Sequence, residues 1–169
     1  MKMKTLVVAA GLCLAFFCGP IANAQDQPQC YTLASLQGSY SIIGHYGAHL
    51  AIALVRAHLD GKGNFASTFV VNEPDPASTT GGRKLVTGSQ TGTYTLNCNG
   101  TGVITRLVVS TVGTSTVVSD LVITRAVSKD GVLIATEVVD AQRTPSFIVP
   151  GGIFLTRTYT RLPDDAGQQ

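Results

Sequence analysis

From Gly38 onward the chain alternates between runs of β-branched and aromatic residues and breaks rich in Gly, Asn and Asp. Apolar and polar side chains tend to alternate within the runs, which is typical of strands that bury one face. No stretch after Gln25 combines a sustained helical period with a capping residue. The pattern predicts an all-β domain with eight strands at residues 38–46, 50–59, 65–72, 88–98, 101–110, 115–126, 132–140 and 153–161.

Turn signals between these runs predict which strands form hairpins. Asn99-Gly100 and Asp130-Gly131 predict two-residue turns, because both positions of such a turn need a positive φ. The segment Asp60–Asn64 predicts a third tight turn, whose register the sequence leaves open. The turn at Asp130-Gly131 places Ile123 opposite Val138, with the apolar faces of the two strands on the same side.

Register decides which side chains point into the domain, since a shift by one residue exchanges the two faces of a strand. The two-residue turn at Asn99-Gly100 places Tyr94 opposite Thr105, and Arg106 then points to solvent. Pairing Val109 with Val117 requires an odd-length turn between them. The side chains expected to point inward are Tyr40, Ile42, Tyr94, Leu96, Thr105, Leu107, Ser119, Leu121, Ile123 and Thr136.

Eight antiparallel strands of this length predict a single up-and-down barrel, which leaves no exposed sheet edge. A two-sheet β-sandwich is the alternative. In the barrel, the three tight turns gather at one end, and the longer segments 73–84 and 141–152 gather at the other. We therefore expect one closed end and one open end, with the segment before the first strand crossing the floor at the closed end.

The start of the chain predicts export. Lys2 and Lys4 precede the apolar run 6–17, and Ala22-Asn23-Ala24 is a small-residue cleavage signal. We expect a secreted or periplasmic protein without a membrane span, because no later stretch is continuously apolar over the roughly 20 residues that a spanning helix needs. The expected division is a signal peptide at 1–24, a barrel domain at 25–163 and a disordered C-terminal tail at 164–169.

Cleavage changes both the cysteine count and the charge. It removes Cys13 and Cys18, so that Cys30 and Cys98 remain, and both fall at the closed end of the expected barrel. In an oxidising compartment this placement predicts a disulfide between them. Loss of two lysines lowers the 12 Lys and Arg to 10, equal to the 10 Asp and Glu. A nucleic-acid partner is not expected, since no positive excess is left to neutralise phosphates.

Three segments carry a resemblance: Leu36–Tyr40, Asp60–Asn64 and Gly92–Cys98. Together they are similar to a family of small secreted bacterial β-barrel proteins, from which no activity can be carried over. The strand count and covered floor also resemble, more distantly, the lipocalin and calycin barrels. That second resemblance implies that the protein carries a small apolar ligand.

The first functional hypothesis is a small apolar molecule bound in the barrel mouth, entering between segments 73–84 and 141–152. The candidate ligand contacts are Tyr40, Tyr94, Thr105, Ser119, Arg125 and Phe147. A filled interior is the competing interpretation, because small barrels are often packed with side chains. The protein would then act as a surface or interaction protein, with the apolar segment 146–149 as one contact.

An enzyme that cyclises a substrate inside the barrel is a further alternative, with Arg125 and two tyrosines as polarising groups. No catalytic residue is assigned, since the chain lacks a Gly-x-Ser-x-Gly elbow and its carboxylates fall in turns, loops or outward positions. We expect no metal and no cofactor. His45, His49 and His58 are close in sequence, but no nearby carboxylate completes a ligand set, so we interpret them as surface residues.

Overall fold

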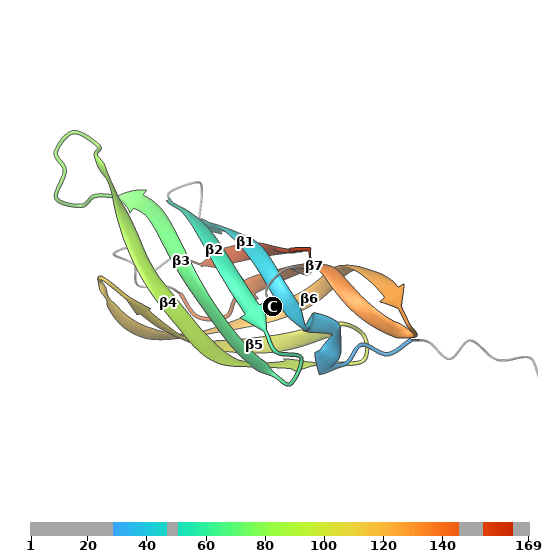
Figure 1. Ribbon diagram of the computed structural model, residues 1–169. Coiled ribbons are helices and arrows are strands. Elements are labelled where there is room, and N and C mark those ends of the chain that lie inside the picture. Colours follow the sequence, from blue (N-terminus) through green and yellow to red (C-terminus); the bar gives the residue numbers. More distant parts are fainter. Residues whose placement is uncertain (1–28, 47–50, 146–153, 164–169) are drawn as a thin grey trace, which may run out of the picture.

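The computed structural model describes residues 29–46, 51–145 and 154–163. Over these residues the chain forms one closed antiparallel barrel, in which each strand pairs with the next and β1 pairs with β8 (Figure 1). The strands are β1 (Gly38–Tyr46), β2 (Ala51–Leu59), β3 (Asn64–Pro74), β4 (Arg83–Leu96), β5 (Thr101–Ser110), β6 (Gly113–Lys129), β7 (Val132–Gln142) and β8 (Leu155–Arg161). The predicted up-and-down barrel is confirmed, and the β-sandwich alternative is excluded.

The strands alternate between the barrel interior and its outer surface, as the period of a strand requires. In β2, for example, every odd-numbered residue is buried and every even-numbered residue is exposed. The interior holds most of the apolar side chains of the barrel, including Ile42, Val55, Leu59, Phe65, Phe69, Val71, Val86, Ile104, Val117, Leu121 and Tyr159. Among the described residues, no helix is long and apolar enough to cross a membrane.

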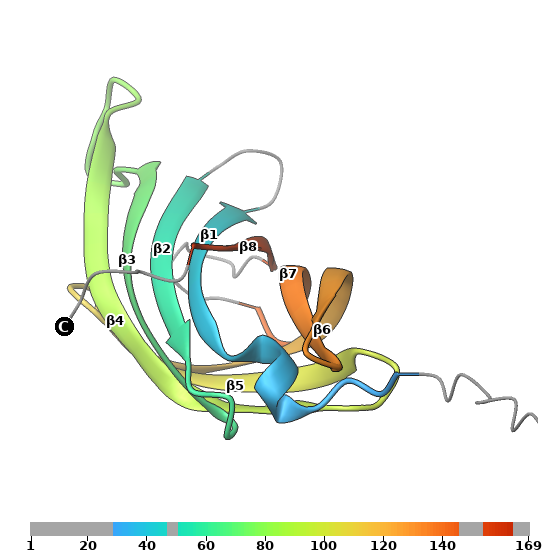
Figure 2. The same ribbon diagram turned by 45° about the vertical axis from the view of Figure 1, so that its right-hand side comes forward.

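A single turn of 3-10 helix, η1 (Leu33–Leu36), covers one end of the barrel (Figure 2). The Leu36 side chain is buried in the core, and the Tyr94 hydroxyl donates a hydrogen bond to the Leu33 carbonyl at 3.2 Å. The amide of Tyr31 also bonds the Cys98 carbonyl at 3.1 Å. These contacts confirm the predicted floor at the closed end.

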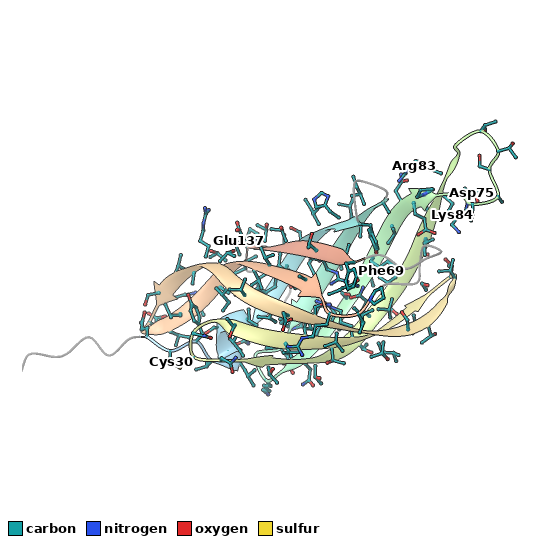
Figure 3. All side chains as sticks on the ribbon, turned by 180° about the vertical axis from the view of Figure 1, so that it is seen from behind. Cys30, Phe69, Asp75, Arg83, Lys84 and Glu137 are labelled. Carbon is teal, nitrogen blue, oxygen red and sulfur yellow. A yellow bond between two sulfur atoms is a disulfide. The ribbon has the colours of Figure 1, made fainter. Side chains whose placement is uncertain are left out.

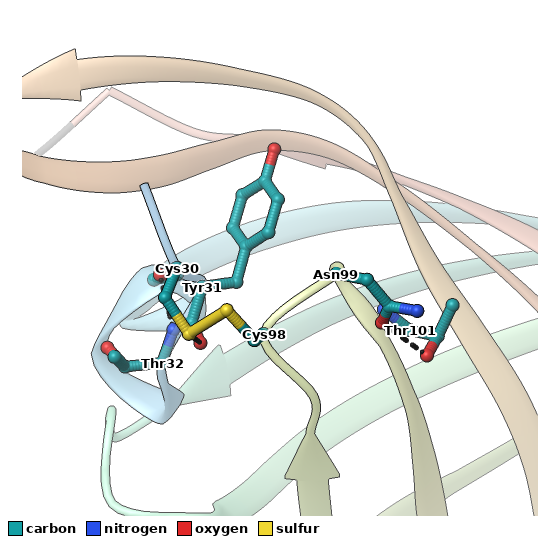
Figure 4. The surroundings of a disulfide bond; sticks show 7 residues. Cys30, Tyr31, Thr32, Cys98, Asn99 and Thr101 are labelled. Atoms are coloured by element: carbon teal, nitrogen blue, oxygen red, sulfur yellow. Dashed lines mark hydrogen bonds between the residues drawn. A yellow bond between two sulfur atoms is a disulfide. The ribbon is translucent and has the colours of Figure 1, made fainter. Parts of the chain in front are cut away.

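A disulfide between Cys30 and Cys98 fastens this floor to the end of β4 (Figure 4). Their Cα atoms lie 4.5 Å apart, and the bond closes a loop of 68 residues. In the loop-entropy model, closing such a loop reduces the entropy of the unfolded chain and thereby stabilises the folded state by about 4 kcal/mol. The predicted disulfide is confirmed, and Cys98 lies outside the strands. It is exposed, because β4 already ends at Leu96.

The register between β4 and β5 differs from the prediction by one residue. Tyr94 pairs with Ile104 rather than Thr105. The reason is the turn: the Asn97 amide bonds the Thr101 carbonyl at 2.7 Å, which leaves three loop residues, and Gly100 takes the positive φ of 84° at the last of them. Every side chain of β5 therefore changes face. Arg106 is buried, whereas Thr105 and Leu107 point outward.

The next connection compensates for this shift. Ser110 pairs with Gly113 across a two-residue turn, so the predicted pairing of Val109 with Val117 is wrong and Val109 lies opposite Thr114. The turn has two residues where an odd number was expected, so the inward and outward side chains of β6 are again those predicted. Ser119, Leu121 and Ile123 are buried as expected.

The hairpin of β6 and β7 follows the prediction closely. Asp130 and Gly131 have φ values of 51° and 77°, as a two-residue turn of this type needs. Ile123 lies opposite Val138 as expected. The ladder is irregular beside this pair, so that Arg125 faces Glu137 and is exposed.

Two hairpins extend beyond the closed part of the barrel, at opposite ends of it (Figure 1). β4 pairs with β3 from Arg83 but with β5 only from Gly88, so the β3–β4 hairpin projects past the open end. β6 pairs with β5 only as far as Val122, and β7 pairs with β8 only from Glu137. The β6–β7 hairpin therefore projects past the floor.

Candidate functional site

The middle of the barrel is filled by a buried polar network centred on Asp140 of β7. The carboxylate accepts hydrogen bonds from Arg106 and from the Tyr159 hydroxyl, and Arg157 donates to it at 2.7 Å. Arg106 also donates to Ser119 at 3.0 Å. The network joins β5, β6, β7 and β8 across the interior, where the side chains of Arg106 and Asp140 are completely buried.

The network contains two guanidiniums and one carboxylate, and direct contacts stabilise these charges in place of solvent. Burial acts to lower the pKa of Arg106, but the neighbouring Tyr159 and Asp140 outweigh it and raise the pKa. Burial raises the pKa of the Tyr159 hydroxyl, because it disfavours the phenolate. The Arg106 guanidinium also lies 5.4 Å from the centre of the Phe65 ring. Most polar groups are therefore satisfied, which buried charges require.

Above the network, the barrel mouth is narrow. The cavity there is lined by residues of all eight strands: Tyr46, Ala53, Val55, Phe69, Val71, Gln90, Val108, Ser115, Val117, Gln142, Leu155 and Arg157. Its volume is about 10 Å³, which is room for roughly one water molecule. The interior is thus packed with side chains, as the competing interpretation of the sequence expected.

Five of the six predicted ligand contacts are among the described residues, and these five do not line one common space. Tyr40 and Tyr94 are buried towards the floor, and their hydroxyls donate to the carbonyls of Ala135 and Leu33, each at 3.2 Å. Ser119 is buried inside the polar network. The three others lie elsewhere: Thr105 points outward, Arg125 is exposed and Phe147 falls outside the described residues. The predicted signal peptide, His49, the segment 146–149 and residues 164–169 also fall outside the described residues.

Sequence reasoning missed the charged members of the network. In β8 a signal was present, since Leu155, Arg157 and Tyr159 share one face and the intervening residues are all threonine. An arginine on the apolar face of a strand indicates a buried partner. The partner carboxylate, Asp140, lies on another strand, at the end of the predicted strand 132–140. The sequence separation between Asp140 and Arg157 therefore could not show that the two residues pair.

Five exposed aliphatic side chains lie next to one another on the outer surface of β1–β4. Ile43, Leu54 and Val70 form one row across three strands, because Leu54 pairs with both of the others. Ile52 and Leu85 stand in the next row, on either side of Asn72. We call these five residues the aliphatic patch. Their exposed fractions run from 41% for Val70 to 67% for Leu85, although apolar residues of a barrel normally face inward.

Two hollows cross this patch. The first has a volume of about 580 Å³ and is lined by Ile52, Leu54, Val70, Asn72, Arg83 and Leu85. The second, of about 490 Å³, adjoins it through Leu54 and Val70 and reaches Arg56, Thr68 and Thr87. Both hollows are open to solvent along the outer surface, whereas the cavity in the mouth is more enclosed.

An arginine stands at each end of the patch. Arg56 is two residues from Leu54 along β2, and Arg83 is two residues from Leu85 along β4. Arg83 donates to the Asn72 side chain at 2.5 Å and to its carbonyl at 3.0 Å, which holds the guanidinium beside the first hollow. Figure 3 shows Arg83 and Lys84 where the β3–β4 hairpin leaves the rim. Lys84 lies 3.3 Å from the buried carboxylate of Glu73.

Carboxylates are distributed unevenly around the barrel. None of the described outward-facing residues on β1, β2, β3, β4 and β8 is Asp or Glu. On β6 and β7, Asp120 accepts a hydrogen bond from Arg143 at 2.9 Å, and Glu137 accepts one from Thr124 at 2.9 Å. The patch therefore belongs to a side of the barrel that carries arginine and histidine but no exposed acid along its strands.

These features define the protein as a closed eight-stranded barrel with a filled, charged interior and an aliphatic outer surface. No protein-family model, curated protein or solved structure matches the chain. The functional argument consequently rests on the geometry of this chain. The disulfide is compatible with an extracellular or periplasmic location.

Proposed function

We propose that this protein is an exported lipid-binding protein that holds a hydrocarbon chain in the hollows of its aliphatic patch, outside a filled barrel. The observation that carries the proposal is the patch itself: five adjoining aliphatic side chains are all at least two-fifths exposed, and four of them, all except Ile43, line open hollows of about 580 and 490 Å³. Clustered apolar exposure of this kind marks interaction sites on soluble proteins.

The energy of such binding is moderate. Covering the exposed part of each aliphatic side chain is worth roughly 1 kcal/mol, and each methylene of the bound chain adds about 0.8 kcal/mol. Part of this gain is lost when the chain is immobilised. The expected complex is therefore reversible, as suits a protein that picks up and delivers its ligand.

The backbone around the patch favours a hydrocarbon chain over a peptide. The strands that carry Leu54 and Val70 are each paired on both sides along these rows. Their amide and carbonyl groups are already used in the ladders, so an extended peptide laid across them would leave its own backbone groups without partners. An unsubstituted alkyl chain has no such groups to satisfy.

The mouth stays the alternative proposal, as do the cyclase hypothesis and the expected likeness to lipocalins. A ligand in the mouth would have to displace packed side chains such as Phe69 and Leu155, since the cavity of about 10 Å³ holds no drug-sized molecule. The outer patch needs no such rearrangement and is the better-supported site.

A neutral fluorescent alkyl probe, N-dodecyl dansylamide, tests this function on the mature protein. We expect binding that weakens by about tenfold or more in Leu54→Ser/Leu85→Ser, which removes about 1.4 kcal/mol or more of contact. The matched control is Leu107→Ser/Val109→Ser, which removes two aliphatic side chains from the outer surface of β5. Each is 46% exposed in the wild type, and the double variant should leave the affinity unchanged. Equal losses in both variants, or no binding by the wild type, would refute the proposal.

A further inference from the structure

We propose that the mouth of the barrel binds one small monovalent anion, chloride in practice, against the guanidinium of Arg157. The site differs from the aliphatic patch in position and in chemistry, so this inference goes beyond the proposed function and does not depend on it. It is carried by the net charge of the buried network and by the polar side chains that line the cavity above that network.

The first step is the net charge of the interior. The network contains the two guanidiniums of Arg106 and Arg157 but one carboxylate, that of Asp140, which leaves one positive charge in excess. Tyr159 does not offset this charge, because burial raises the pKa of its hydroxyl and keeps it protonated. A buried charge without a counterion is costly. One bound anion of single charge would therefore balance the network.

The charge of Glu73, the other buried carboxylate among the described residues, is already used. Its side chain lies near the end of β3 and pairs with Lys84 at 3.3 Å, so these two charges cancel. Neither residue lines the cavity in the mouth, whereas Arg157 does. The excess positive charge therefore belongs to the network, and it reaches the cavity through Arg157.

The second step is the chemistry of the cavity wall. Four polar side chains that line it are each more than nine-tenths buried: Tyr46, Gln90, Gln142 and Arg157. The side-chain carbonyl of Gln142 already accepts a hydrogen bond from the Leu155 amide at 3.1 Å, so its NH2 group is what this side chain can still offer. Arg157 binds Asp140 through Nη1, and the rest of its guanidinium consists of further N–H donors.

Tyr46 and Gln90 add two more donors. Burial raises the pKa of the Tyr46 hydroxyl, and the nearby Arg157 opposes this only in part, so the hydroxyl is protonated and can donate. No hydrogen bond joins the Tyr46 hydroxyl or the Gln90 side chain to another described residue. The wall thus presents one cation and several hydrogen-bond donors to whatever it encloses, and such an environment favours an anion.

The third step is size. The cavity has a volume of about 10 Å³, which admits a guest the size of a single water molecule. Chloride is only slightly larger than water, whereas acetate and sulfate each bring several heavy atoms. A water molecule would fit as well, but it would leave the excess charge of the network unbalanced. The combination of charge, donors and volume therefore selects a monatomic anion.

Chloride titration of the mature protein tests the inference, with sodium gluconate replacing sodium chloride so that the ionic strength stays constant. We expect the protein to broaden the chloride-35 NMR signal. Chloride at about ten times its dissociation constant should lower the ratio of unfolded to folded protein by about elevenfold. Urea titration measures this ratio, since guanidinium chloride would itself supply the ion. Acetate should neither narrow the broadened signal nor stabilise the protein.

Variants of the wall locate the site. Tyr46→Phe and Gln90→Met each remove one donor at nearly constant size, and each should weaken chloride binding by about tenfold or more, as expected for a hydrogen bond to a charged group. The matched control is Tyr94→Phe, which removes a buried hydroxyl at the floor and should leave the affinity unchanged. Arg157→Gln should abolish binding, because the remaining guanidinium and carboxylate of the network then balance each other.

The outcomes also separate this inference from the proposed function. A wild type that shows neither broadening nor stabilisation by chloride would overturn the inference, whatever the result with N-dodecyl dansylamide. Equal losses in Tyr46→Phe and Tyr94→Phe would show that chloride acts outside the mouth, and competition by acetate would contradict a monatomic site. If Arg157→Gln does not fold, the two donor variants decide. Loss of alkyl-probe binding alone would leave the anion site standing.

Discussion

Inside the barrel, the largest fully buried side chain is that of Arg106, whereas outside it Leu54 and Leu85 are more than three-fifths exposed. The two surfaces of the same sheet thus depart in opposite directions from the usual apolar interior and polar exterior. The interior tolerates charge because a carboxylate stands between two guanidiniums. Among the described residues, the aliphatic groups of the patch remain exposed. The buried charges are thus explained by contacts within the fold, whereas the exposed aliphatic groups are the basis of the binding proposal.

The largest effect should come from breaking the interior. Asp140→Ala leaves two buried guanidiniums without their carboxylate, and we expect it to lower the free energy of unfolding by about 3–5 kcal/mol, measured by denaturant titration. Asp120→Ala, which breaks the exposed pair with Arg143, should change it little. Equal effects of the two variants would mean that the network contributes nothing beyond a surface ion pair.

Loss of the disulfide should have the next largest effect on stability and none on the patch. Cys30→Ser/Cys98→Ser should lower the free energy of unfolding by about 2–4 kcal/mol, because the unfolded chain regains the freedom of the 68-residue loop. Alkyl-probe affinity of the folded variant should be unchanged, since the bond fastens the floor. A parallel loss of affinity would show that the patch depends on the closed end.

The outer surface should behave in the opposite way. Leu54→Ser should reduce alkyl-probe affinity by roughly fivefold, corresponding to about 1 kcal/mol of lost contact, and should change stability by no more than about 0.5 kcal/mol. Thermal unfolding and probe titration of one preparation measure both quantities. Destabilisation comparable to that of Asp140→Ala would mean that Leu54 is part of the core.

The smallest expected effect is local and depends on pH. Hydrogen bonds from the Asn64 side chain, and then from the Asn64 and Lys62 amides, lower the pKa of Asp60 from its ordinary 3.8 to about 2. Because the folded-state pKa is depressed, the contribution of this turn is present above pH 3.8 and is lost as the pH falls through about 2. Carboxyl NMR titration measures the pKa directly. Asn64→Ala should return it towards 3.8, and an unchanged value would show that the Asn64 side chain plays no part.

Much of the fold could be predicted from the sequence because turns and alternation are local signals. The bounds of β1 and β5 agree with the predicted runs, and the Asp130-Gly131 turn has the expected φ values. The sequence could not predict which side chains of β5 point inward, since the residues around Asn99-Gly100 are compatible with a loop of either two or three residues. That one ambiguity concealed Arg106, and with it the interior network.

The sequence contains a sign of the aliphatic patch, although an alternating pattern alone does not indicate it. Residues 51–55 are all apolar, so a strand there must place apolar side chains on both faces. In a barrel one of those faces is necessarily outside. Which neighbours it meets depends on two registers, those that place Leu54 opposite Ile43 on one side and opposite Val70 on the other.

The central claim is that a hydrocarbon chain binds outside the barrel and not within it. Intermolecular NOEs between a dodecyl maltoside chain, kept below its micelle concentration, and the methyl groups of the mature protein test this claim directly. We expect contacts to Leu54, Val70 and Leu85, and none to Val117, Val108 or Leu155 of the mouth. Contacts to the mouth residues without contacts to the patch would contradict it.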